Sequence, residues 1–96
     1  MLLPGAPAPC KVLVVEDDKP TRLLVERIIR AHGHPVVGCD SAEAALDHLQ
    51  QEFFPLITLD IQLPGMSGLE LTRLLRSSPD GRKYYILVGT GNNRPE

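Results

Sequence analysis

The sequence has no tryptophan, only two cysteines and no excess of charge of either sign. Two cysteines are too few for a disulfide framework, and the three histidines lack the cysteine or carboxylate companions of a zinc site. Ten basic residues against twelve acidic ones leave no basic surface for nucleic acid and no polybasic membrane patch. No apolar run approaches the roughly 18 residues that span a bilayer. We therefore expect a chain that binds neither nucleic acid nor membrane directly.

Sequence signatures of common enzymes are also missing. There is no GxxxxGK[ST] or GxGxxG loop for nucleotide phosphates and no GxSxG segment for a serine nucleophile. Residues 1–10 are rich in proline, glycine and alanine and contain no basic residue, so they predict a flexible leader and not a signal peptide. Residues 11–96 suffice for one globular domain, which we expect to be cytoplasmic.

Short hydrophobic runs alternate with helical patterns along this domain. The expected strands are 11–15, 35–39, 55–59 and 84–88. The expected helices are 20–32, one capped by Asp40 or Ser41, and one that runs from a cap at Ser67 to about Ser78. Because parallel strands need helical crossovers, the alternation predicts an α/β fold, a parallel sheet with helices on both faces.

Apolar spacing assigns a buried face to each expected helix. The residues expected in the core are Leu24, Val25, Ile28 and Ile29 of the first helix and Leu71, Leu74 and Leu75 of the third. On the first helix, Arg22 and Glu26 are expected to face water. On the second, Glu43 would complete a capping box if Asp40 is the cap.

Acidic residues follow the strands at their carboxyl ends, where a parallel sheet places its functional crevice. Glu16, Asp17 and Asp18 follow the first strand. Asp60 follows the third strand, and Thr90 the fourth. Like charges gathered there repel unless a cation lies among them, and oxygen ligands select a hard ion such as Mg²⁺. The alternative is that the acids only decorate solvated loops, but so many at neighbouring strand ends favour a site.

Three segments resemble the signature sequences of the response-regulator receiver domain of two-component signalling. They are VLVVEDD, LITLDIQLPGMSG and ILVGTG, and the similarity covers residues 11–91 in order and spacing. The sequence LDxxLPGMSG after a buried strand is specific, and the acids upstream strengthen the match. The resemblance implies a flavodoxin-like fold with strand order 2-1-3-4, which the family continues with a fifth strand.

The resemblance implies a role for each matching residue. Asp60 matches the aspartate that accepts a phosphoryl group from a histidine kinase or a phosphotransfer protein. Glu16 and Asp17 match the acids that hold Mg²⁺, for which Mn²⁺ could substitute. The backbone carbonyl of Gln62 matches the position that completes the metal shell. Thr90 matches the hydroxyl residue that senses the phosphoryl group.

The resemblance extends to further residues, and the sequence differs from the family in one respect. The remaining matches are a dispensable acid at Asp18, a turn at Pro64, Gly65 and Gly68, and a small residue at Gly91. The family continues with a helix, a fifth strand that carries a lysine and an aromatic switch residue, and a final helix, whereas this sequence ends six residues after Thr90. We therefore expect an incomplete receiver, without the fifth strand and last helices, whose apolar strand 84–88 is an exposed edge. Such a chain should self-associate or be marginally folded.

The implied function is a phosphoacceptor module that works with a kinase and with an output domain or downstream protein. It is not a turnover enzyme, because it would phosphorylate and dephosphorylate only itself. The alternative is a receiver-like scaffold that binds partners without phosphorylation, since the family's lysine is missing. A phosphohydrolase with an aspartate nucleophile is disfavoured, because that class has a second acid two residues after the nucleophile, where Gln62 stands.

The two cysteines are expected at opposite ends of the sheet. Cys10 precedes the first strand and Cys39 ends the second. If these strands are parallel neighbours, the cysteines lie on the order of 15 Å apart. A disulfide needs Cα atoms within about 7 Å, so both thiols are predicted to be free.

Overall fold

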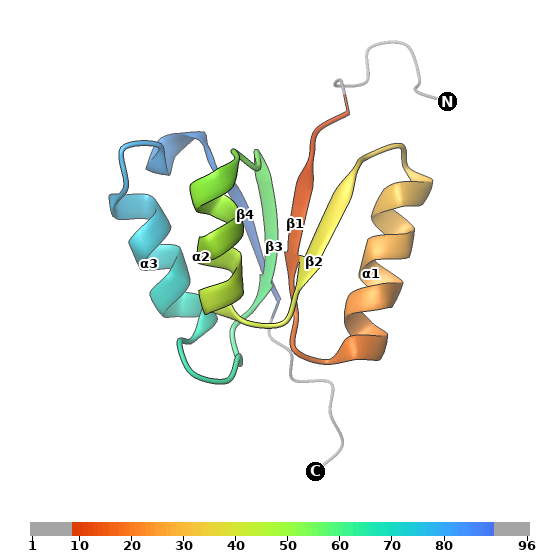
Figure 1. Cartoon of the computed structure of the whole chain (residues 1–96), viewed down its shortest axis with the longest axis horizontal. Coiled ribbons are helices and arrows are strands. Elements are labelled where there is room, and N and C mark those ends of the chain that lie inside the picture. Colours follow the sequence, from red (N-terminus) through yellow and green to blue (C-terminus); the bar gives the residue numbers. More distant parts are fainter. Residues whose placement is uncertain (1–8, 90–96) are drawn as a thin grey trace.

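The computed structural model describes residues 9–89, in which four strands form one parallel sheet flanked by helices (Figure 1). Most of the predicted leader lies outside this range, as do Thr90 and Gly91. The strands are β1 (Val12–Val15), β2 (Val36–Cys39), β3 (Leu56–Asp60) and β4 (Tyr85–Gly89). The helices are α1 (Lys19–Ala31), α2 (Ala42–Gln51), α3 (Gly68–Ser77) and the short 3₁₀ helix η1 (Gly81–Lys83).

The sheet has the order β2-β1-β3-β4, and each neighbouring pair is parallel. Val15, the last residue of β1, pairs with Cys39 of β2 and with Leu59 of β3. Figure 1 shows α1 on one face of the sheet and α2 and α3 on the other. The predicted strand order and the predicted covering of both faces are confirmed. The residues that follow β1 and β3 therefore meet at one edge of the sheet.

The main hydrophobic core lies between the sheet and helices α2 and α3. Side chains alternate between the two faces of a strand, and those of β1 and β3 that point into this core are Leu13, Val15, Ile57 and Leu59. The buried side chains that meet them are Ala42, Ala45, Phe54, Leu71 and Leu75. Truncating one large core side chain costs about 2–5 kcal/mol, so this core holds β1 and β3 rigidly side by side.

Helix α1 buries only part of the predicted face, because Val25 and Ile29 are half-buried but the other two residues are not. Glu26, expected to face water, is only 8% exposed, whereas Leu24 and Ile28, expected in the core, are 55% and 50% exposed. The facing residue of β2 is Gly38, which has no side chain, so the carboxylate of Glu26 fills the space beside it. Arginines one turn before and one turn after neutralise this buried charge. The apolar spacing did not predict this burial, because the charged side chains of α1 itself fill the space beside Gly38.

Helix α3 and strand β4 both leave apolar side chains exposed. Leu74 of α3 was predicted in the core but is 47% exposed, because α3 turns Leu71 and Leu75 toward the sheet instead. Strand β4 forms an edge of the sheet, with Tyr85 74% and Leu87 53% exposed. The exposed apolar edge expected at 84–88 is thus confirmed for the described residues.

The helix ends settle the alternatives that the sequence left open. Ser41, not Asp40, caps α2, and its hydroxyl accepts a hydrogen bond from the Ala44 amide at 3.0 Å. Helix α1 ends at Ala31, and Gly33, two residues later, has a φ of +89°, which glycine readily adopts. Both cysteines, which lie within the described residues, are free thiols as predicted.

Candidate functional site

Three acidic side chains gather at the edge of the sheet where β1 and β3 end. One carboxylate oxygen from each of Glu16, Asp17 and Asp60 lies within 4.8 Å of the other two. Asp60 is only 4% exposed, whereas Glu16 and Asp17 are half-buried. The pairing of β1 with β3 brings them together, because Val15 and Leu59 are partners and the next residue of each strand carries the acid.

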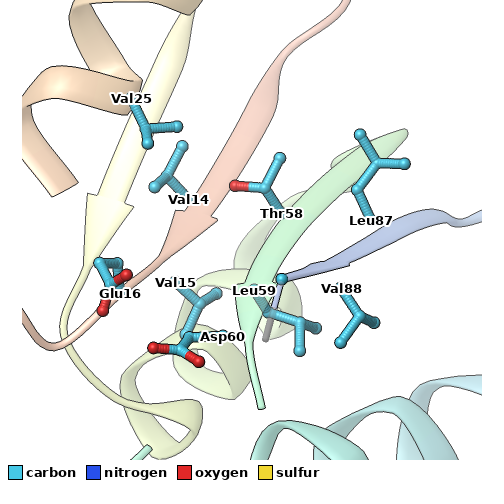
Figure 2. Close-up of a pocket in the computed structure, with 10 residues that line it drawn as sticks. Val14, Val15, Glu16, Val25, Thr58, Leu59, Asp60, Leu87 and Val88 are labelled. Carbon is cyan, nitrogen blue, oxygen red and sulfur yellow. The ribbon is translucent and has the colours of Figure 1, made fainter. Parts of the chain in front are cut away.

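A pocket of about 310 Å³ opens beside this cluster on the face of the sheet that carries α1. Its lining is mostly apolar and comes from β1, β3, β4 and α1. Figure 2 shows the carboxylates of Glu16 and Asp60 at one end of the pocket, with Val14, Thr58 and Leu87 farther along it. Glu16 and Asp60 therefore border a cleft whose walls are mostly apolar.

The cluster is electrostatically unfavourable when it holds only carboxylates. Burial raises the pKa of the Glu16 carboxyl above its ordinary value, and the charges of Asp60 and Asp17 raise it further, while a backbone hydrogen bond from Asp18 opposes the increase. A cation among the three oxygens would relieve this repulsion. The donors are all carboxylate oxygens, which suit a hard divalent ion such as Mg²⁺. The residues present thus fit the predicted metal.

The loop that follows Asp60 fixes the direction of its carboxylate. The Gln62 amide donates to Oδ1 of Asp60 at 3.0 Å. The Ile61 amide donates to the Gly89 carbonyl of β4, and the Ile61 carbonyl accepts from the Gly68 amide at the start of α3. Gly68 is required here, because a Cβ atom would lie 2.2 Å from the carbonyl oxygen of Asp60. Backbone contacts from two neighbouring elements therefore hold the end of β3.

The far side of this loop is tied to α2. Gly65 has a φ of +73°, as expected for the predicted turn. Glu43 lies against this glycine and accepts a hydrogen bond from the Met66 amide at 3.2 Å. The sequence suggested a capping role for Glu43. The structure places it instead as a tether between α2 and the loop beside Asp60.

The loop after β1 is equally well fixed. The Glu16 amide donates to the Cys39 carbonyl at 3.0 Å, and one oxygen of its carboxylate accepts from the Asp18 amide at 3.2 Å. Asp18, predicted as a dispensable acid, caps α1 by accepting from the Thr21 amide at 3.1 Å. Its position just before a proline in the first helical turn was the signal for that role.

The predicted site residues have different outcomes. Glu16, Asp17 and Asp60 come together as predicted. Gln62 is next to Asp60, where its amide makes the described contact, and the metal-binding role of its carbonyl stays a prediction. Thr90 lies outside the described residues. Sequence reasoning missed Arg22, which was expected to face water but contacts the Glu16 backbone.

Comparison with known protein families agrees with this geometry. Residues 12–96 match the family described as the response regulator receiver domain. This chain belongs to that family. The chain is thus a receiver domain of two-component systems, and its sheet order is that of the receiver fold. None of the helices within residues 9–89 is long and apolar enough to cross a membrane.

The receiver domain is similar to parts of much longer proteins. It is 45% identical over 67 residues to the response regulator protein FleR of Pseudomonas aeruginosa, a match that covers 70% of this chain and 14% of FleR. It is 32% identical over 87 residues to the CAI-1 autoinducer sensor kinase/phosphatase CqsS of Vibrio cholerae, which covers 90% of this chain and 13% of CqsS. The chain spans about one seventh of the length of these relatives.

One similar solved structure contains a metal ion in its active site cleft. The receiver domain of the sensor histidine kinase PA1611 from Pseudomonas aeruginosa has a TM-score of 0.81 and 27% sequence identity. The match covers 88% of this chain and 70% of the other. That receiver domain was solved with a magnesium ion coordinated in its active site cleft.

Proposed function

We propose that this receiver domain accepts a phosphoryl group on Asp60 from a histidine kinase or a phosphotransfer protein. The observation that carries the proposal is the convergence of three carboxylates within 4.8 Å, two of which line one end of a pocket. Glu16, Asp17 and Asp60 would hold Mg²⁺, or Mn²⁺ in its place, together with the Gln62 carbonyl. The magnesium ion in the cleft of the PA1611 receiver domain supports this assignment.

The residues of the chain suit such a transfer. Asp60 would attack phosphorus in line as a carboxylate, forming an O–P bond while the P–N bond of a phosphohistidine breaks and the imidazole leaves. The Gln62 amide, bonded to Oδ1, holds the carboxylate in one orientation during the attack. Mg²⁺, when bound, would offset the repulsion between the acids and the incoming phosphoryl group.

The phosphorylated Asp60 would change the charge of the site and thereby the groups that the site contacts. An acyl phosphate adds negative charge and strong acceptor oxygens beside Glu16 and Asp17. We assign Thr90 as the hydroxyl donor that meets this charge, on the strength of its match to the family position. The loop from Asp60 to α3 would report the change to an output domain or a downstream protein.

The proposed module acts only on itself. Phosphorylation and hydrolysis would take place at its own Asp60, so it would not turn over a separate substrate as an enzyme does. We place it in the cytoplasm, since its proposed phosphoryl donors are kinases or phosphotransfer proteins of two-component signalling.

The test is phosphorylation by a small-molecule donor. Incubating the chain with acetyl phosphate and Mg²⁺ should add the mass of one phosphoryl group, and EDTA should prevent it. Asp60→Asn keeps the size of the side chain but removes the nucleophile, so this variant should gain nothing. If the wild-type chain also gains nothing, the alternative function, a scaffold that binds without phosphorylation, is favoured instead.

A further inference from the structure

Arg22 of α1 reaches across to the loop that carries the proposed metal ligands. Its Nη1 donates a hydrogen bond to the backbone carbonyl of Glu16 at 2.9 Å. That carbonyl belongs to the peptide bond between Glu16 and Asp17, the two acids that follow β1. A charged donor makes a stronger hydrogen bond than a neutral one. Arg22 therefore restrains the peptide plane from which both carboxylates project.

Glu26 holds the guanidinium group of Arg22 in place. The two side chains lie one helical turn apart, with Nε of Arg22 3.9 Å from Oε2 of Glu26, and they are only 17% and 10% exposed. Arg30, one turn farther along, approaches the other oxygen of Glu26 at 3.3 Å but is 57% exposed. A buried carboxylate needs such partners, because an unpaired one would lose its hydration without compensation.

Gly38 of β2 makes room for this cluster. A Cβ atom there would lie 2.0 Å from Oε2 of Glu26 and 3.3 Å from Cδ of Arg22. Gly38 pairs with Val14, which precedes Glu16 by two residues. The space beside this glycine thus places a charged pair directly next to the strand that leads into the acidic site.

We propose that Arg22 is a positioning residue for the metal site and acts through the Glu16–Asp17 peptide. Glu26, which lies against Gly38, holds Arg22 in place. The inference rests on the proposed function in so far as Mg²⁺ binds Glu16 and Asp17. Ligand carboxylates bind a metal well only when groups behind them fix their direction, and loss of such a group typically lowers metal affinity about 10- to 100-fold. Arg22 supplies that support through the backbone.

The alternative is that Arg22 merely packs α1 against β2. Arg30 provides the matched control, because it pairs with the same Glu26 carboxylate, whereas the donor to the Glu16 carbonyl is Arg22. Replacing either arginine by methionine keeps the aliphatic stem and leaves Glu26 with one ion-pair partner. Only Arg22→Met removes the donor to the Glu16 carbonyl.

The experiment is an NMR titration of the ¹⁵N-labelled chain with Mg²⁺. Arg22→Met should bind Mg²⁺ about 10- to 100-fold more weakly, and in the metal-free protein its Asp17 amide should shift and exchange faster with solvent. Arg30→Met should match the wild type in both respects. Wild-type affinity in Arg22→Met, or equal weakening in both variants, would overturn the inference.

Two further arms keep the result interpretable. If Arg22→Met does not fold, Arg22→Lys keeps a charged donor but has only one nitrogen, whereas arginine uses Nη1 for the Glu16 carbonyl and Nε for Glu26. Arg22→Lys should therefore show intermediate affinity, and wild-type affinity would contradict the proposed hold of Glu26 on Arg22. If the wild-type chain does not bind Mg²⁺, the proposed function fails, and the positioning role is then decided by the Asp17 amide alone. An Asp17 amide whose chemical shift and exchange rate are unchanged in Arg22→Met would contradict the positioning role.

Discussion

Asp17 is one of three carboxylates whose mutual repulsion is tolerated at the end of β1 and β3. Asp17→Ala removes part of that repulsion, so the metal-free chain should become more stable by about 0.5–1 kcal/mol. The same change should abolish divalent-ion binding, because too few protein oxygens remain. Thermal unfolding with and without Mg²⁺ checks both effects, since a bound ion raises the midpoint only where it binds. An Asp17→Ala midpoint that still rises with Mg²⁺ as in the wild type would contradict the metal assignment.

The two thiols should differ in reactivity. Burial raises the pKa of Cys39 to about 11, and the thiolate is the form that reacts. Iodoacetamide at pH 8 should therefore modify Cys10, which is only half-buried, and spare Cys39 until urea unfolds the chain. Because the folded state favours the protonated thiol, its contribution to stability is lost as pH rises toward 11. Peptide mass spectrometry after a timed reaction checks this, and equal labelling of both cysteines would contradict it.

Single residues of the site differed in how well the sequence predicted them. Asp60 and Asp17 were predictable because each lies at or just after the carboxyl end of a buried strand, and parallel strands end at one edge of a sheet. The contacts of Arg22 and Glu43 were not, since both reach residues that are distant in the chain or depend on how a loop folds. Helix periodicity describes which residues share a face but not which backbone groups that face meets.

At the scale of elements, the start of α3 connects the fold to the site. Ser67 caps this helix by accepting from the Glu70 amide at 3.1 Å, so Ser67→Ala should cost about 1 kcal/mol of unfolding free energy. Gly68→Ala should cost more, because the added Cβ would lie 2.2 Å from the carbonyl oxygen of Asp60, a backbone atom with little freedom to move. Urea unfolding followed by circular dichroism ranks the two. A Gly68→Ala variant as stable as the wild type would show that β3 and α3 are not packed so closely.

The order and type of the elements followed from the sequence, whereas one helix face did not. Alternating hydrophobic runs and caps such as Ser67 predicted the strands and helices of the sheet. For α1 the prediction that Leu24 and Ile28 are buried was wrong, because Glu26 faces β2 at Gly38 and no described element covers those two residues. A glycine that packs against a helix cannot be recognised from the sequence alone, since the contact between glycine and helix exists only in the folded protein.

At the scale of the whole molecule, the two faces of the sheet are covered unequally. Helices α2 and α3 cover one face, whereas in residues 9–89 the other carries only α1, and β4 is an exposed edge (Figure 1). We expect this 96-residue chain, studied alone, to self-associate through β4 and that face. Leu87→Lys, at a position 53% exposed on β4, should weaken the association. Leu69→Lys, at a position 49% exposed on α3, should not.

Sedimentation velocity over a range of concentrations measures this association. The weight-average mass of the wild type should rise with concentration, and that of Leu87→Lys should rise less. A compact monomer at every concentration would show that the uncovered face and the edge strand are compatible with an isolated domain.

The proposed function requires that Asp60 itself carries the phosphoryl group. Borohydride reduces an acyl phosphate to an alcohol, which converts a phosphorylated aspartate to homoserine and marks the site permanently. After treatment with acetyl phosphate and Mg²⁺, then borohydride and proteolysis, mass spectrometry should find homoserine at residue 60, and only when both the donor and Mg²⁺ were present. Reduction at Glu16 or Asp17 in place of Asp60, or at no residue in a chain that binds Mg²⁺, would contradict the proposed function.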